Sequence, residues 1–259
     1  MSIVTLITDF GTRDGYVGEM KGEILARCPD ATLVDVTHDV EPGDIQGASW
    51  VLNRVWSRFP EGTVHLGVVD PGVGGARRAV AVERADRWFV GPDNGLISAA
   101  VDGLPSQARI IDPDSLGLAP ASVTFHGRDV FAPAGAWLAG GGAPARVGEA
   151  IDPGSLVRLE LPGPERLGAA VRGQVAHIDR FGNLVTDIPA AWVSPTALIE
   201  ISGEEVSGLR THYGAAEDGE LLALIGSGGM LEISVRNGSA AARLSAHRGA
   251  VVRVRTHRD

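Results

Sequence analysis

The strongest constraint on the fold is a pattern that occurs twice in the first third of the chain. An apolar run ends at an aspartate and is followed at once by a glycine-containing turn, first at residues 3–11 and again at residues 64–75. Such runs are typical of buried strands in a parallel sheet. Pro71 has no N–H to donate, so the second strand must leave the sheet directly after Asp70. Ligands of open α/β sheets bind beyond the carboxyl ends of the strands, so Asp70 is a candidate ligand contact; a structural turn with a surface aspartate is the alternative.

Helical patterns separate these predicted strands. Residues 14–27 and 43–59 carry apolar side chains at helical spacing, and residues 32–36 form a further strand. Asp14 is the expected cap of the first helix. The order strand, helix, strand, helix, strand predicts an α/β fold with a mostly parallel sheet and flanking helices. The expected buried face of the first helix comprises Tyr16, Met20, Ile24 and Leu25.

In the next part of the chain, the residue pattern predicts a pair of strands at residues 79–83 and 88–90 and a short strand at 109–111. Residues 123–129 are expected to form a loop that leads into a helix at 130–138, with His126 just before the helix begins.

The composition of the sequence changes after residue 139, where prolines are frequent and helical patterns are few. We expect an N-terminal α/β domain at residues 1–150, a linker at 151–168 and a smaller C-terminal domain at 169–259. Short runs of β-type or alternating pattern in the last part are separated by turns, which indicates a small barrel or sandwich.

Composition and charge exclude several classes of protein. The formal net charge of −9 argues against binding to nucleic-acid phosphates, which requires basic patches. Cys28 is the only cysteine, so neither an intramolecular disulfide nor a four-cysteine zinc site can form. No stretch reaches the roughly 18 apolar residues of a membrane span, and we expect a soluble, cytoplasmic protein.

Polar clusters with possible chemical roles lie at the predicted turns, and each has a structural alternative. The structural alternatives are a helix cap for Asp9, a solvated face for Arg77 and satisfaction of a helix N-terminus for His126. Residues 179–183 and 227–229 are also ordinary turn sequences. A metal site formed by carboxylates and imidazole is conceivable, but the nearby guanidinium of Arg77 would repel the metal.

Two common catalytic signatures are missing. The glycines at residues 72–75 are not followed by Gly-Lys-Ser/Thr, so they do not form a phosphate-binding P-loop. No Gly-x-Ser-x-Gly elbow of a serine hydrolase is present.

Taken together and in order, the motifs resemble those of the S-adenosyl-L-methionine hydrolases, also called S-adenosyl-L-methionine hydroxide adenosyltransferases, which are related to the fluorinating and chlorinating enzymes. The resemblance covers nearly the whole chain. The matching motifs lie at residues 6–11, 14–18, 69–74, 91–95, 125–129, 181–184 and 226–227.

The resemblance implies an N-terminal α/β domain, a C-terminal β-barrel and a homotrimer with the ligand between the N-terminal domain of one subunit and the C-terminal domain of its neighbour. It implies that Asp70, Arg77 and His126 orient an attacking water or hydroxide. It also implies that S-adenosylmethionine is the substrate and that no cofactor or metal is needed. The substrate-binding residues carried over are Asp9 at the ribose, Asp179 and Ser227 at the methionine moiety, and Phe181 and Asn183 around the adenosyl group. Further substrate-binding residues are Phe10, Arg236, Asn237 and Gly238.

This sequence departs from the family in one place. The family often has Asn before Arg where this chain has Arg236 before Asn237. Which of these two side chains faces the adenine therefore stays open at this point.

The expected reaction is attack of water on the C5′ carbon of a sulfonium, which releases methionine as a neutral thioether. Asp70 and His126 are both candidates to take the proton of the water. One alternative is a halogenase acting at the same carbon, but a carboxylate at position 70 would repel a halide. The other is a protein that binds S-adenosylmethionine or adenosine without catalysis.

Overall fold

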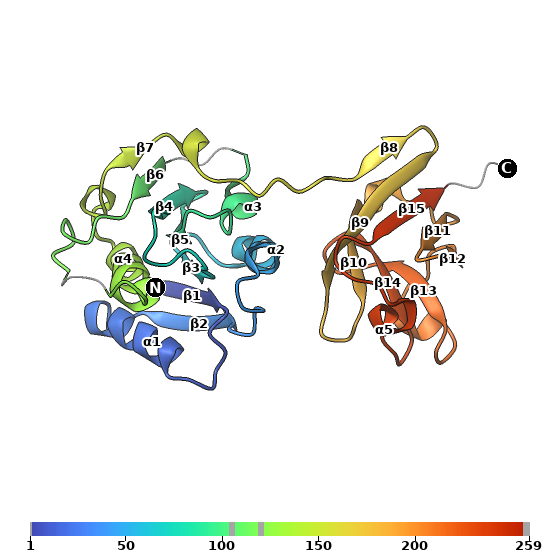
Figure 1. Ribbon diagram of the computed structural model, residues 1–259, viewed down its shortest axis with the longest axis horizontal. Helices are drawn as coiled ribbons and strands as arrows, with labels where there is room; N and C mark the ends of the chain where they lie inside the picture. Colours follow the sequence, from blue (N-terminus) through green and yellow to red (C-terminus); the bar gives the residue numbers. More distant parts are fainter. Residues whose placement is uncertain (1, 104–106, 119–121, 256–259) are drawn as a thin grey trace. The chain divides into compact units, whose positions relative to one another are not determined.

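The computed structural model describes residues 2–103, 107–118 and 122–255. The chain folds into two compact units, Met1–Glu160 and Leu161–Asp259, each with its own sheet and its own hydrophobic core (Figure 1). Within the residues described, no helix is both long and apolar enough to cross a membrane.

In the described part of the first unit, seven strands form one sheet in the order β2-β1-β3-β5-β4-β6-β7. The strands β2, β1, β3 and β5 pair in parallel, whereas β4, β6 and β7 are added antiparallel. This confirms the predicted α/β fold with a mostly parallel sheet. The strands are β1 (Ile3–Thr8), β2 (Thr32–Thr37), β3 (Val64–Val68), β4 (Ala79–Arg84), β5 (Arg87–Pro92), β6 (Gln107–Ile110) and β7 (Ala150–Ile151).

Helices cover both faces of this sheet, because successive residues of β1 point to opposite sides. Val4 and Leu6 pack with α1 and α4 in one core cluster, and Ile7 packs with α2 and α3 in another. The helices are α1 (Tyr16–Arg27), α2 (Ile45–Val55), α3 (Ser98–Val101) and α4 (Ala132–Ala139), with the short turns η1 (Trp56–Arg58), η2 (Gly127–Phe131), η3 (Pro144–Arg146) and η4 (Pro153–Ser155).

The predicted start of the first helix is wrong, and its predicted buried face is correct for Met20 and Ile24 but wrong for Tyr16 and Leu25. Helix α1 begins at Tyr16 without a side-chain cap, so Asp14 does not cap it. Tyr16 and Leu25 are exposed, because they lie beside the narrow stripe that faces the sheet. The second predicted helix is shorter than expected and begins after Asp44, whose carboxylate accepts a hydrogen bond from the Gly47 N–H. The buried residues of α1 are Val17, Met20 and Ile24.

The second unit is a nearly closed antiparallel barrel, which confirms the expected β-barrel. In its described part the strands lie in the order β12-β11-β15-β9-β10-β14-β13, with β8 paired to β9. A bridge between Leu209, just after β12, and Ala223 in β13 brings the two edges together. The elements are β8 (Glu165–Leu167), β9 (Ala170–Ile178), β10 (Leu184–Pro189), β11 (Leu198–Ile201), β12 (Glu204–Ser207), β13 (Leu221–Ile225), β14 (Met230–Val235), β15 (Val251–Arg255), α5 (Ala240–Leu244), η5 (Ala190–Trp192) and η6 (Tyr213–Ala215).

A histidine lies in the core of the first unit. His65 in β3 has no solvent exposure, and its Nδ1 is 2.8 Å from the Thr5 hydroxyl. Its ring stacks on Phe89 at a centroid distance of 5.2 Å. Burial, and secondly the positive charge of Arg87, lower the pKa of His65 to about 4. The imidazole is therefore neutral in the folded protein at neutral pH.

We expect the stability of the first unit to fall as the pH drops from about 6.5 to 4. Over this range the unfolded chain binds a proton at His65 and the folded chain does not, so the free energy of unfolding decreases by about 3 kcal/mol. Urea unfolding at several pH values, followed by tryptophan fluorescence, measures this change, since four of the five tryptophans lie in the first unit. In a His65→Gln variant the dependence on pH should be smaller by that amount, and an unchanged slope would contradict the assignment.

Candidate active site

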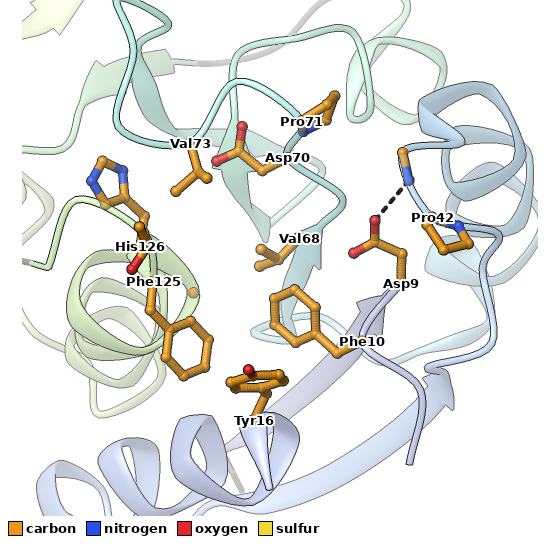
Figure 2. Close-up of a pocket in the computed structure, with 13 residues that line it drawn as sticks. Asp9, Phe10, Tyr16, Pro42, Val68, Asp70, Pro71, Val73, Phe125 and His126 are labelled. Atoms are coloured by element: carbon orange, nitrogen blue, oxygen red, sulfur yellow. Dashed lines mark hydrogen bonds between the residues drawn. The ribbon is translucent and has the colours of Figure 1, made fainter. Parts of the chain in front are cut away.

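The two aspartates that end the repeated sequence pattern lie at the same edge of the sheet. Strands β1 and β3 are parallel neighbours, with Thr8 opposite Val68. Asp9 and Asp70 follow these strands and line the same cavity, which has a volume of about 540 Å³ (Figure 2). Both aspartates therefore lie beyond the carboxyl ends of neighbouring parallel strands, where the sequence pattern predicted them.

Arg77 returns to Asp70 through a tight turn. Its Nε donates to both carboxylate oxygens of Asp70, at 3.0 and 2.9 Å, and its Nη2 donates to Oδ2. Gly74 makes the turn possible: its φ is +74°, and a Cβ there would lie 2.3 Å from the carbonyl oxygen of Val123. Only glycine allows the turn to approach the segment that leads to His126 so closely.

The same guanidinium reaches the third candidate residue. Nη2 of Arg77 lies 2.6 Å from Nδ1 of His126, the residue that precedes η2. A guanidinium has no acceptor, so Nδ1 of His126 must accept this hydrogen bond. The three side chains, expected to act together, are thus joined directly.

Burial and the contact with Arg77 together keep His126 neutral. Burial, and secondly the charge of Arg77, lower the pKa of His126, and together they outweigh the carboxylates of Asp70 and Asp129. The ring is therefore neutral at pH 7 and carries its proton on Nε2. In this form His126 can donate a hydrogen bond from Nε2, whereas the lone pair of Nδ1 is already occupied.

Asp9 is held by the backbone. Its Oδ2 accepts a hydrogen bond of 2.8 Å from the N–H of Gly43, and its other oxygen points toward the cavity (Figure 2). The loop after Asp9 is fixed by His38, whose carbonyl accepts from the Gly11 N–H and whose Nδ1 contacts the Thr8 hydroxyl at 2.9 Å. Asp9 therefore does not cap a helix.

Three aromatic rings form one wall of the cavity, and the sequence identified only one of them as a site residue. Phe10, Tyr16 and Phe125 contact one another edge to face, with centroid distances of 5.3 to 6.0 Å (Figure 2). Tyr16 was missed because it was assigned to the buried face of its helix. Phe125 was missed although it directly precedes His126. Such a wall suits an apolar or cationic guest.

The barrel unit has a cavity of its own, with a volume of about 560 Å³. It gathers most of the substrate-binding residues expected in this half of the chain, together with Tyr213, which the sequence analysis missed because no motif marks it. The residues that line it are Asp179, Phe181, Asn183, Tyr213, Gly214, Val235, Arg236, Asn237 and Gly238.

The segment from Asp179 to Asn183 is a turn and a cavity wall at once. Oδ1 of Asp179 accepts from the N–H groups of Phe181 and Asn183, each at 2.9 Å, and its Oδ2 accepts from the Asn183 side chain. These bonds push the Phe181 ring outward, where 76% of its surface is exposed. Ser227 lies in the turn between β13 and β14 and does not line the cavity.

The side chains of Arg236 and Asn237 both hold a neighbouring loop. Arg236 pairs with Asp218 at 3.0 Å and donates to the carbonyl of Ala216, and Asn237 donates to Asp218 at 2.9 Å. Both side chains are therefore engaged within the unit, and both residues also line the cavity.

In residues 2–103, 107–118 and 122–255, no three or more histidine, cysteine, aspartate or glutamate side chains are grouped so that they could hold a metal ion.

Comparison with known proteins gives consistent matches along both units. Residues 4–148 match the family model described as SAM hydroxide adenosyltransferase N-terminal domain, and residues 173–253 match its C-terminal domain. The (R)-S-adenosyl-L-methionine hydrolases of Thermus thermophilus and Salinispora tropica are 40% and 38% identical to this chain. The first alignment covers 98% of this chain and 100% of the relative, and the second covers 97% of each.

A more distant relative and a solved structure are also similar to this chain. A fluorinase of Actinoplanes sp. is 31% identical over 72% of this chain and 71% of its own. The crystal structure of an uncharacterized conserved protein from Thermotoga maritima superimposes with a TM-score of 0.91 and 35% identity, and covers 98% of this chain and 100% of its own.

Removing the guanidinium should raise the pKa of His126. In an Arg77→Met variant the nearby positive charge is lost and the carboxylates of Asp70 and Asp129 remain, so the imidazole becomes easier to protonate. Titration of the histidine ring signals by NMR measures the shift.

Arg78→Met is the matched control, because the Arg78 guanidinium pairs with Asp93 instead. This variant should leave the titration of His126 unchanged. A His126 pKa that stays constant or falls in Arg77→Met would contradict the contact.

Proposed function

Since the chain belongs to the SAM hydroxide adenosyltransferase family, we propose that Asp70, Arg77 and His126 form the catalytic group with which this enzyme hydrolyses S-adenosyl-L-methionine to adenosine and L-methionine. The observation that carries this assignment is the single guanidinium that joins the carboxylate to the imidazole at the wall of a cavity. A structural turn would not require a partly buried arginine to contact a histidine 49 residues further along the chain.

The chemistry requires an oriented water rather than a strong acid. The oxygen of water forms a bond to C5′, the bond between C5′ and sulfur breaks, and methionine leaves as a neutral thioether. One proton of the water must be accepted. Nδ1 of His126 already accepts from Arg77, so we assign proton acceptance to Asp70 and assign to His126 a hydrogen bond from Nε2 to the oxygen of the water.

The remaining features of the first cavity fit the rest of the substrate. Asp9 presents a carboxylate oxygen to the cavity, as binding of the ribose hydroxyls requires (Figure 2). The wall formed by Phe10, Tyr16 and Phe125 suits a sulfonium cation, which is attracted to aromatic faces. Alignment of water, C5′ and sulfur in such a site accounts for a large part of the rate. The thioether leaves without an acid or a Lewis acid, so we propose that no metal or cofactor takes part.

The C-terminal cavity supplies the other half of the binding site in this proposal. Phe181 and Asn183 contact the adenosyl group, and Asp179 binds the methionine moiety. For Ser227, which does not line this cavity, the proposed contact with the methionine moiety rests on the family resemblance alone. Each cavity is open and lined by residues of one unit alone. We therefore propose a homotrimer in which the C-terminal cavity of one subunit completes the N-terminal cavity of its neighbour. In this proposal Phe10 of the N-terminal cavity and Arg236, Asn237 and Gly238 of the C-terminal cavity also contact the substrate. We also propose that the enzyme is cytoplasmic.

The natural substrate is proposed to be the (R) epimer at sulfur. Relatives that align with nearly the whole chain are named (R)-S-adenosyl-L-methionine hydrolases.

Halogenation is less well supported. The fluorinases are less similar to this chain than the hydrolases are. A carboxylate at position 70 repels a halide, whereas a neutral water can approach it. Incubation with chloride should yield adenosine and no 5′-chloroadenosine.

Substitutions in the catalytic group should slow turnover more than they weaken binding. We expect Asp70→Asn to lower kcat by about 100- to 10,000-fold, because it removes the proton acceptor. His126→Ala should cost about 100-fold and His126→Gln less, because glutamine keeps an N–H donor. Single-turnover release of adenosine, with Kd measured separately, tests this. The roles would be wrong if either change mainly raised Kd.

The two epimers should be hydrolysed at clearly different rates. They differ in the positions of the methyl group and the lone pair on sulfur, and a shape difference of this size is worth about tenfold or more in kcat/KM. Assays with each purified epimer should favour the (R) form. Equal rates, or a preference for the (S) form, would overturn the substrate assignment and leave the hydrolysis assignment standing.

A further inference from the structure

The barrel unit holds a buried carboxylate that the proposed reaction does not use. Glu232 lies in β14, paired with Val185 of β10 and Leu224 of β13, and only 6% of it is exposed. A buried carboxylate is costly unless it accepts hydrogen bonds. The Tyr213 hydroxyl donates to its Oε1 at 2.6 Å and the Ser234 hydroxyl at 3.1 Å.

Tyr213 connects this carboxylate to the cavity. Its ring lines the cavity and is 46% exposed, while its hydroxyl reaches inward to Glu232. Burial raises the pKa of Tyr213 to about 12, with further contributions from the hydrogen bond and charge of Glu232. The phenol therefore stays protonated and remains a donor at neutral pH.

The loop that begins at Tyr213 is held at two points. Arg236 binds the backbone of the loop at the Ala216 carbonyl and pairs with Asp218. These contacts fix the path of the chain and do not involve the Tyr213 side chain. The hydrogen bond to Glu232 is the contact that holds the half-exposed ring in one orientation.

We propose that Glu232 is a positioning residue for the purine of the substrate: through the Tyr213 hydroxyl it holds the Tyr213 ring in the plane against which the adenine packs, and it does not touch the substrate itself. This inference rests on the proposed function, which brings the adenosyl group to this cavity. Aromatic rings are effective surfaces for a base to stack on. A ring already held in its binding orientation loses less conformational freedom when the ligand arrives.

Tyr213→Phe tests the inference most directly, because it keeps the ring and removes only the hydrogen bond to Glu232, here called the tether. We expect KM for S-adenosylmethionine to rise about three- to tenfold, with kcat within about twofold of the wild type. Glu232→Ala should have the same effect, and the double variant should be no worse than either single one. Glu232→Gln should recover most of the loss, because its amide oxygen still accepts from the phenol.

Ser234→Ala is the matched control. It removes the other hydrogen bond to the same carboxylate without contacting the ring, so KM should stay at the wild-type value. A wild-type KM in Tyr213→Phe would overturn the inference, as would an additional loss when Glu232→Ala is combined with Tyr213→Phe. If Glu232→Ala does not fold, the KM values of Tyr213→Phe and Ser234→Ala still test the inference: a raised KM in the first variant alone supports it, and equal KM values contradict it.

Calorimetric binding of adenosine separates this inference from the proposed function. If the wild type binds adenosine but does not hydrolyse S-adenosylmethionine, the proposed reaction fails, and the Kd of Tyr213→Phe still tests the tether. If the wild type hydrolyses its substrate and Tyr213→Phe binds adenosine as tightly as the wild type, the tether fails alone. If the wild type neither hydrolyses S-adenosylmethionine nor binds adenosine, both are overturned.

Discussion

One guanidinium holds together the polar groups on which the proposed reaction depends. Arg77 donates to both oxygens of Asp70 and, from the same Nη2, to Nδ1 of His126. The planar fork of arginine can make these contacts at fixed angles, which the ammonium of lysine cannot. Because Nδ1 of His126 accepts, its proton lies on Nε2. The contact therefore assigns donor and acceptor roles before any substrate is bound.

The fold supports this contact by simple means. Two parallel neighbouring strands place Asp9 and Asp70 at the same edge of the sheet. A glycine with a left-handed backbone, Gly74, lets the turn after Asp70 approach Val123, and the chain then leads to His126 at the start of η2. The turn and the helix start are thus matched in shape, so an added Cβ at Gly74 would disturb the site without altering any catalytic side chain.

The parts of the site that the sequence predicted are those governed by local rules. The ends of apolar runs located Asp9 and Asp70, and the short spacing placed Arg77 within reach of Asp70. His126 could be joined to them only by resemblance to a family, because no spacing rule relates residues so far apart. Tyr16 was assigned to the wrong side of its helix, since an apolar ring can line a cavity as well as a core.

In the barrel, too, the sequence predicted the features that depend on local pattern and missed those that depend on distant residues. Its longer strands follow from their patterns, whereas β8, β12 and α5 have only three to five residues, too few to show a period. The segment from Asp179 to Asn183 was predicted either as a turn or as part of a site. Its hydrogen bonds form the turn, and Phe181 also lines a cavity. Tyr213 carries no motif, and its contact with Glu232 depends on folding across 19 residues.

The most direct test of the shared guanidinium is the tautomer of His126 in the wild-type protein. Nitrogen NMR of the ring at pH 7 should show Nε2 bearing the proton and Nδ1 without one, because Nδ1 accepts from Arg77. A proton on Nδ1, or an imidazolium with protons on both nitrogens, would contradict the account, since His126 would then not be held by Arg77.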